Sequence, residues 1–286
     1  YLGKGDYDNA ISDFTILIAY SSFLTREHNF TIYSNRGLAY SYKKEYQKAI
    51  EDYTIAIVFS PDYFLGYHNR GQAYIEINNY EEAIQDLTKA IELQPNSYIS
   101  YAGRGKAYNG IGEYDKAILN FEKAIELYTP ENINYFQKTA VMAEIKYDEI
   151  YNNLGNSYYS KKYYDKSITY FTKSIDNNPL YANAYLGRGK AYYAKNDYIN
   201  GIKDFSRAKE IDPTLKIPFL NPVLVGIIVF PLVLIIILLV LLKRKKKIVS
   251  NNRQQNIRNI CPSCGKVLKP NWISCPNCGF HLRTRR

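Results

Sequence analysis

Small and apolar residues recur in a fixed order through residues 30–213. Five glycines mark this order, 34 residues apart except for one step of 50: Gly37, Gly71, Gly105, Gly155 and Gly189. Counted from each glycine, an aromatic residue comes at three, a tyrosine at nine, a small residue at twelve, a bulky residue at sixteen and a small residue at nineteen. Apolar residues three and four apart form one face of an α-helix, so each unit is predicted to contain two short amphipathic helices.

Residue size predicts how these helices pack. The small positions let two backbones approach, and the large side chains fill the space between them; a proline then stops most second helices. The bulky set is Tyr53, Leu87, Phe121, Phe171 and Phe205, and the small sets are Ala49, Ala83, Ala117, Ser167 and Gly201, then Ala56, Ala90, Ala124, Ser174 and Ala208. Arginines directly before four of the glycines (Arg36, Arg70, Arg104 and Arg188) are expected to have a repeated packing or salt-bridging role.

With these residues at this spacing, the chain resembles the tetratricopeptide repeat family. The resemblance implies an all-α solenoid of helical hairpins. Residues 1–29 match the second half of a further unit, followed by a loop, and residues 30–213 contain five units. An insertion at about residues 131–147 is predicted to be an elongated or additional helix, with Thr129 as its cap and Pro130 in its first turn.

The resemblance also implies that a concave surface binds a peptide or protein segment. By analogy, the first helix of each unit lines this groove, at positions three before and one after the glycine. The candidate contacts are His68, Gln72, Lys106, Asn152, Asn156 and Lys190. We expect His68 to be solvated, because no second histidine or paired acid accompanies it. The lysine and asparagine set with which one subgroup of the family grips a carboxylate-terminated peptide is not in register.

A long apolar stretch follows the short linker 214–221. Residues 222–242 are predicted to form one transmembrane helix, because Val223 to Leu242 contain no charge and a helix of that length spans roughly 30 Å. Asn221 and Pro222 suit the start of the helix, and Pro231 is tolerated within it. A buried core helix, the alternative, would need a large surrounding protein.

Positive charge is concentrated beyond this stretch. Residues 243–286 carry 12 lysines and arginines and no acid. The basic segment 243–260 is expected to contact lipid headgroups through Lys243, Arg244, Lys245, Lys246 and Lys247. Lysine and arginine favour the cytoplasmic flank of a membrane helix, so the prediction is a single-pass cell-membrane protein with a cytoplasmic C-terminal tail. The repeats would lie outside if a signal peptide precedes residue 1, and in the cytosol otherwise.

Four cysteines lie close together within residues 261–281: Cys261, Cys264, Cys275 and Cys278. Two pairs of spacing C-x₂-C, each followed by a glycine, suit one tetrahedral Zn²⁺ with a closed and therefore structural site. The segment resembles a zinc ribbon, a small β unit, with Trp272 and Ile273 expected in its core. Disulfides, a redox pair and His281 as a replacement ligand are the less favoured alternatives.

Catalysis is not expected. The chain has three histidines, no phosphate-binding loop and no nucleophile motif, and no small-molecule substrate is predicted. The predicted function is a membrane-anchored adaptor whose groove binds a protein or peptide, with a cytosolic zinc ribbon as a second interaction module. The alternative is a membrane-tethered regulator that binds nucleic acid through the basic tail.

Overall fold

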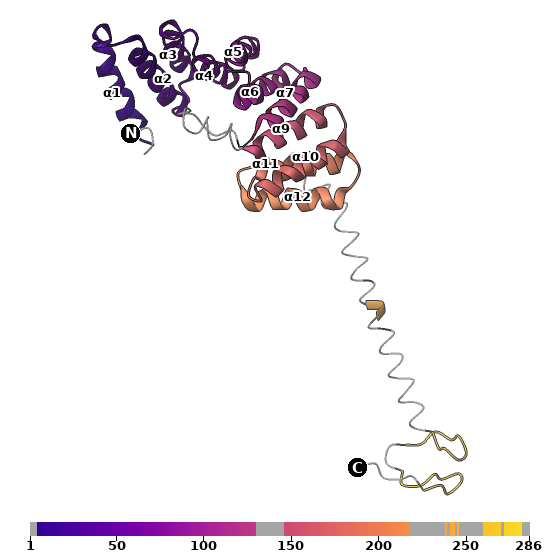
Figure 1. Cartoon of the computed structure of the whole chain (residues 1–286). Coiled ribbons are helices and arrows are strands. Elements are labelled where there is room, and N and C mark those ends of the chain that lie inside the picture. Colours follow the sequence, from indigo (N-terminus) through magenta and orange to yellow (C-terminus); the bar gives the residue numbers. More distant parts are fainter. Residues whose placement is uncertain are drawn as a thin grey trace. The chain divides into compact units, whose positions relative to one another are not determined.

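The computed structural model describes residues 5–129, 146–217, 238, 241–243, 245, 260–269 and 272–281. It divides into two compact units, Tyr1–Lys216 and Ile217–Arg286 (Figure 1). The predicted insertion lies almost wholly outside the described residues.

The first unit is a succession of helical hairpins. The first helices of the hairpins are α2 (Arg26–Tyr42), α4 (Phe64–Glu76), α6 (Tyr98–Gly110), α9 (Tyr147–Ser160) and α11 (Ala182–Ala194). The second helices are α3 (Tyr46–Phe59), α5 (Tyr80–Leu93), α7 (Tyr114–Leu127), α10 (Tyr164–Asn177) and α12 (Tyr198–Ile211). Each helix packs against the next, and α9 packs directly against α7 (Figure 1). The predicted all-α solenoid is confirmed.

The core is made by the positions that the sequence pattern predicts. Tyr53, Leu87, Phe121 and Phe171 are completely buried, and Phe205 is 1% exposed. The small residues beside them permit this packing. At Gly187, for example, an added Cβ would lie 2.3 Å from the ring of Phe171, so α11 approaches α10 too closely for any larger side chain.

One residue in each turn between paired helices has a left-handed backbone. These residues are Lys44, Asn78, Gly112, Lys162 and Asn196, two positions before the tyrosine that begins each second helix. Their φ angles lie between 61° and 78°. The left-handed conformation reverses the chain direction within three or four residues, which places the two helices side by side.

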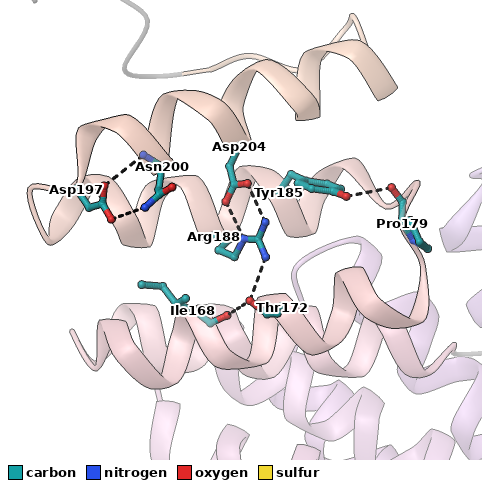
Figure 2. Close-up of polar contacts among 8 residues, drawn as sticks. All are labelled: Ile168, Thr172, Pro179, Tyr185, Arg188, Asp197, Asn200 and Asp204. Atoms are coloured by element: carbon teal, nitrogen blue, oxygen red, sulfur yellow. Dashed lines mark hydrogen bonds and ion pairs between the residues drawn. The ribbon is translucent and has the colours of Figure 1, made fainter.

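Three of the four recurring arginines bind a carboxylate on the partner helix. Figure 2 shows Arg188, whose Nε and Nη2 donate to Asp204 at 2.7 and 2.9 Å and whose Nη1 donates to Thr172 of the preceding hairpin at 3.1 Å. Arg36 and Arg70 make equivalent bonds to Asp52 and Asp86. The expected salt-bridging role is confirmed for these three arginines, whereas Arg104 binds the amide oxygen of Asn120.

The start of the array contains another second helix, α1 (Tyr7–Ala19), which packs against α2. Its Thr15 accepts a hydrogen bond from Arg36, the position that Thr54 has for Arg70. The expected loop after α1 is mostly helical: a short 3₁₀ turn, η2 (Ser21–Phe23), leads to α2, which begins early with Thr25 as its cap.

The second unit contains the predicted membrane span and the cysteines. No helix within the described residues is long and apolar enough to cross a membrane. The predicted span, residues 222–242, lies almost entirely outside those residues, so the structure gives this prediction no support. The described part of residues 260–281 has two isolated antiparallel bridges, Ile260 with Val267 and Ser274 with His281, and no strand. The predicted β character of the ribbon is therefore not observed, because each hairpin pairs at a single position.

Candidate functional site

A groove runs between α2 and α4, the first helices of two successive hairpins. It contains two cavities of about 420 and 220 Å³, which share Leu38 and Asn69 in their walls. Phe30, Tyr63 and Leu65 give the larger cavity an apolar wall, and the rings of Phe30 and Tyr63 meet edge to face with centroids 4.8 Å apart. The groove therefore has apolar walls and a depth suited to side chains.

Several polar atoms in this groove are buried without a hydrogen-bond partner among the described residues. These atoms are Oγ of Ser34 and Oδ1 of Asn69, residues that line the larger cavity, and Nε2 of Gln72, a residue that lines the smaller one. Ser34 is 9% and Asn69 6% exposed. A buried polar atom that has lost water without gaining a partner costs about 1–3 kcal/mol, so a ligand that satisfies these atoms recovers that energy.

His68 is buried, contrary to the prediction that it is solvated. It is 3% exposed, and its Nδ1 lies 3.2 Å from Ser100 Oγ on the neighbouring first helix α6. Burial, with a smaller contribution from Lys106, lowers the pKa of His68 to about 3, so the ring is neutral at pH 7. His68 therefore packs between α4 and α6, beneath the surface, and is not placed to contact a ligand there.

The structure separates the other predicted groove residues. Gln72 lines the smaller cavity and packs over Gly103, where an added Cβ would lie 2.6 Å from its Nε2. Lys106 pairs with Glu149 on α9. Asn152 is buried, and its Oδ1 has no partner among the described residues. Asn156 is exposed and Lys190 half-buried, and neither lines the two cavities; the six candidates do not form one cluster.

The sequence analysis missed the groove residues on α2. The offsets used for the later units, three before and one after the glycine, give Ser34 and Leu38 when counted from Gly37, and both line the larger cavity. A further offset, two before the glycine, carries Asn35 and Asn69, which also line it. The repeat register already marks the positions of Ser34 and Leu38, whereas only the structure shows that the offset of Asn35 and Asn69 faces the cavity.

The four cysteines form a compact cluster. Their sulfur atoms all lie within 4.8 Å of one another, and the Sγ atoms of Cys261 and Cys278, and of Cys264 and Cys275, are 3.6 Å apart. Tetrahedral Zn–S bonds of about 2.3 Å imply sulfurs about 3.8 Å apart, so this cluster fits one zinc ion. None of the four cysteines forms a disulfide bond in the described part of the chain.

A tight turn at the glycine after each cysteine pair brings the two sulfur atoms of that pair to the same side of the chain. Gly265 and Gly279 have φ angles of 72° and 74°, and their N–H groups donate to the carbonyls of Cys261 and Cys275 at 2.9 Å. A hydrogen bond from the backbone of Lys266, with a smaller contribution from Cys278, lowers the pKa of Cys264 to about 6. At Cys278 a backbone hydrogen bond from Phe280 acts in the same direction, but the neighbouring cysteines outweigh it and raise the pKa to about 11, so the four thiols titrate together.

The small core of the ribbon differs from the predicted one. Leu268 is buried with Cys261 and Cys275, and Trp272 packs against them. Ile273, expected in this core, is 65% exposed. His281 is outside the cysteine cluster, and its Nδ1 lies 3.2 Å from the Ile273 carbonyl oxygen. The weaker prediction of His281 as a replacement ligand therefore gains no support.

Only part of the predicted lipid-binding segment is described. Lys243 and Lys245 are helical and exposed, whereas Arg244, Lys246 and Lys247 lie outside the described residues. Exposed lysines are common on any protein surface, so they support neither a lipid nor a nucleic-acid partner over the other.

Comparison with known proteins agrees with this architecture. Models of the tetratricopeptide repeat match residues 30–63, 64–97, 98–129, 148–181 and 182–215, together more than half of the chain. A zinc-ribbon domain model matches residues 260–282. No curated protein matches the chain.

Solved structures resemble the repeat array. A crystal structure of a MamA protein is 27% identical with a TM-score of 0.51, over 65% of this chain and 93% of that one. The pilF protein of Pseudomonas aeruginosa is 16% identical with a TM-score of 0.53, over 65% and 77% of the two chains. The Cut9–Hcn1 hetero-tetramer of the APC/C is 19% identical with a TM-score of 0.62, over 75% and 39%. At these lower identities the likeness to the last two concerns the fold alone.

Proposed function

This chain belongs to the tetratricopeptide repeat family, and we propose that it is a membrane-anchored adaptor whose α2–α4 groove holds a segment of a partner protein. The zinc ribbon, holding one structural zinc ion, is its second interaction module. The observation that carries the groove assignment is the set of buried polar atoms without partners in the walls of two adjoining cavities. A polypeptide supplies hydrogen-bond donors for Ser34 Oγ and Asn69 Oδ1, a carbonyl acceptor for Gln72 Nε2, and apolar side chains that pack against the apolar walls.

Site-specific crosslinking tests the groove assignment. A photoreactive amino acid replaces Asn35, in the groove wall, or Glu51, exposed on the second helix α3. We expect a discrete crosslinked partner from position 35 of the full chain in its native cells and none from position 51. Adding Asn69→Leu to the position-35 chain should weaken the crosslink, because Oδ1 is then lost as an acceptor. Equal crosslinking at both positions, or none at position 35, would overturn the proposal.

The membrane anchor rests on the composition of residues 222–242. Its support is the run of twenty residues from Val223 to Leu242 without a charge, which costs little in hydrocarbon and much in water. Leu238, Leu241 and Leu242, which are among the described residues, are helical and each more than half exposed. A lipid environment would cover such side chains.

Alkaline extraction of membranes checks the anchor. The full chain should stay in the membrane pellet, whereas a chain that lacks residues 222–242 should be released, because only a spanning segment resists extraction. Protease added outside intact cells should digest the repeats if the proposed orientation, with residues 243–286 in the cytoplasm, is correct. Release of the full chain by alkali would exclude a spanning helix.

A further inference from the structure

The α2–α4 groove is acidic. Glu27 lines the larger cavity and Glu76 the smaller one, and neither cavity has a lysine or arginine in its wall. In the smaller cavity, Tyr42 and Tyr46 accompany Glu76, and the Tyr46 hydroxyl donates to Glu76 Oε2 at 3.2 Å. A carboxylate beside tyrosine rings is a favourable environment for a cation, through both charge and ring electrostatics.

Three half-buried cations on the first helices α2, α4 and α6 are already paired with carboxylates. Arg36 and Arg70 each bind a carboxylate on their own second helix, Asp52 and Asp86. Lys106 pairs with Glu149, and the neighbouring His68 is uncharged at neutral pH. Glu27 and Glu76 therefore set the sign of the charge in the walls of the two cavities.

We propose that the occupant of the α2–α4 groove is an extended polypeptide segment that carries arginine or lysine side chains next to aliphatic ones. This inference rests on the proposed groove function and names its partner class. The backbone amides of the segment donate to Asn69 Oδ1 and Ser34 Oγ, aliphatic side chains enter the larger cavity against Leu38 and Leu65, and the cations meet Glu27 and Glu76.

The charge of the groove also rejects the opposite class of ligand. An acidic peptide would bring its carboxylates beside Glu27 and Glu76, and like charges at short range weaken binding. Glu27 and Glu76 are exposed, so the attraction of each to a ligand cation is weak and is screened by salt. Selectivity therefore depends on two carboxylates acting together.

Fluorescence anisotropy on the purified full chain tests the charge preference. The probes are two fluorescein-labelled peptides of glycine, serine and leucine that carry either two arginines or two glutamates at the same positions. We expect the arginine peptide to bind at least about tenfold more tightly at low salt, a ratio that shrinks as salt is added. The double variant Glu27→Gln and Glu76→Gln should remove most of this preference.

A matched control carries the same change in charge elsewhere. Glu51→Gln with Glu82→Gln alters two exposed glutamates on second helices and should leave the preference unchanged. If both peptides bind equally and Asn69→Leu weakens both, the charge preference is wrong while the groove function stands. If neither peptide binds, the charge preference is also wrong, and the crosslinking experiment decides the groove function on its own.

Discussion

The turn between the paired helices of each hairpin contains one residue with a left-handed backbone, a conformation that is strained for any residue except glycine. Lys44, Lys162, Asn78 and Asn196 have positive φ angles, whereas Gly112 fills the same position in the third hairpin. A left-handed conformation costs a non-glycine residue roughly 1–2 kcal/mol. The glycine and asparagine at three of these positions were a signal that the sequence analysis did not use.

Lys44→Gly should therefore stabilise the array by about 0.5–1 kcal/mol, and Gly112→Ala should destabilise it by a similar amount. An added Cβ at Gly112 meets nothing within 4 Å, so its effect reports the backbone alone. Urea unfolding followed by helical circular dichroism measures both variants. Opposite signs from these two substitutions are the expected result, and equal signs would contradict the argument.

Burial of His68 predicts a pH dependence of stability. Its pKa is about 3 in the folded chain and about 6.5 in the unfolded chain, so between these values only the unfolded chain binds a proton there. The free energy of unfolding thus falls as pH drops below 6.5, by up to about 1.4 kcal/mol per pH unit from this group.

The variant His68→Gln should lose this component between about pH 5 and 6, where fewer carboxylates titrate. Unfolding free energies across the pH series give the comparison. A His68→Gln slope identical to wild type would show that the imidazole is protonated in the folded chain.

At the scale of elements, neighbouring hairpins are joined by the arginine hydrogen bonds, and this ladder changes in the middle of the array. Arg104 meets Asn120 in place of an aspartate, through a 2.9 Å bond from Nε. In the next unit, Leu154 stands at the arginine position and Tyr170 at the aspartate position. Leu154 is fully buried, and the ring of Tyr170 stacks on that of Tyr158 with centroids 5.3 Å apart. Apolar contact replaces the ion pair there.

Asp86→Asn should therefore lower the free energy of unfolding by no more than about 1 kcal/mol, because Arg70 keeps an amide oxygen as acceptor, as Arg104 has in Asn120. Arg70→Met should lower the free energy of unfolding by about 2–4 kcal/mol, because it leaves the Asp86 carboxylate, which is 9% exposed, without its bidentate partner. The two variants share a location and differ only in which partner remains. Similar losses for both in urea unfolding would mean that packing, and not charge pairing, holds this position.

At the scale of the whole molecule, the ribbon and the array are separate compact units. Chelation, or Cys275→Ser, should therefore release the zinc ion and unfold the ribbon while the thermal transition of the repeats stays unchanged. Metal analysis should give one zinc per wild-type chain, and Ser263→Ala, an exposed neighbour, should keep it. A shift of the repeat transition on chelation would show that the units depend on each other.

Sequence reasoning predicted most of the fold because its signals are local and repeated. The offsets from Gly155 predicted that Phe171 and Ser174 are packing positions, and both are completely buried. The prediction succeeds because all three residues belong to the same hairpin. Groove contacts were harder to find. They depend on which face of a first helix remains open after its neighbours pack, and neighbours differ from unit to unit.

The sequence by itself determined the 34-residue period, the paired helices and the closely spaced set of four cysteines, because each depends on spacings within one hairpin or one short segment of chain. Tertiary structure alone decided that His68 is buried, because Ser100, 32 residues later, packs over it on the next hairpin. It also decided that Ser34, Leu38 and Asn69 share one cavity wall. Whether a side chain is shielded from water depends on the neighbouring hairpin that packs against it, and the sequence of a single repeat does not specify that neighbour.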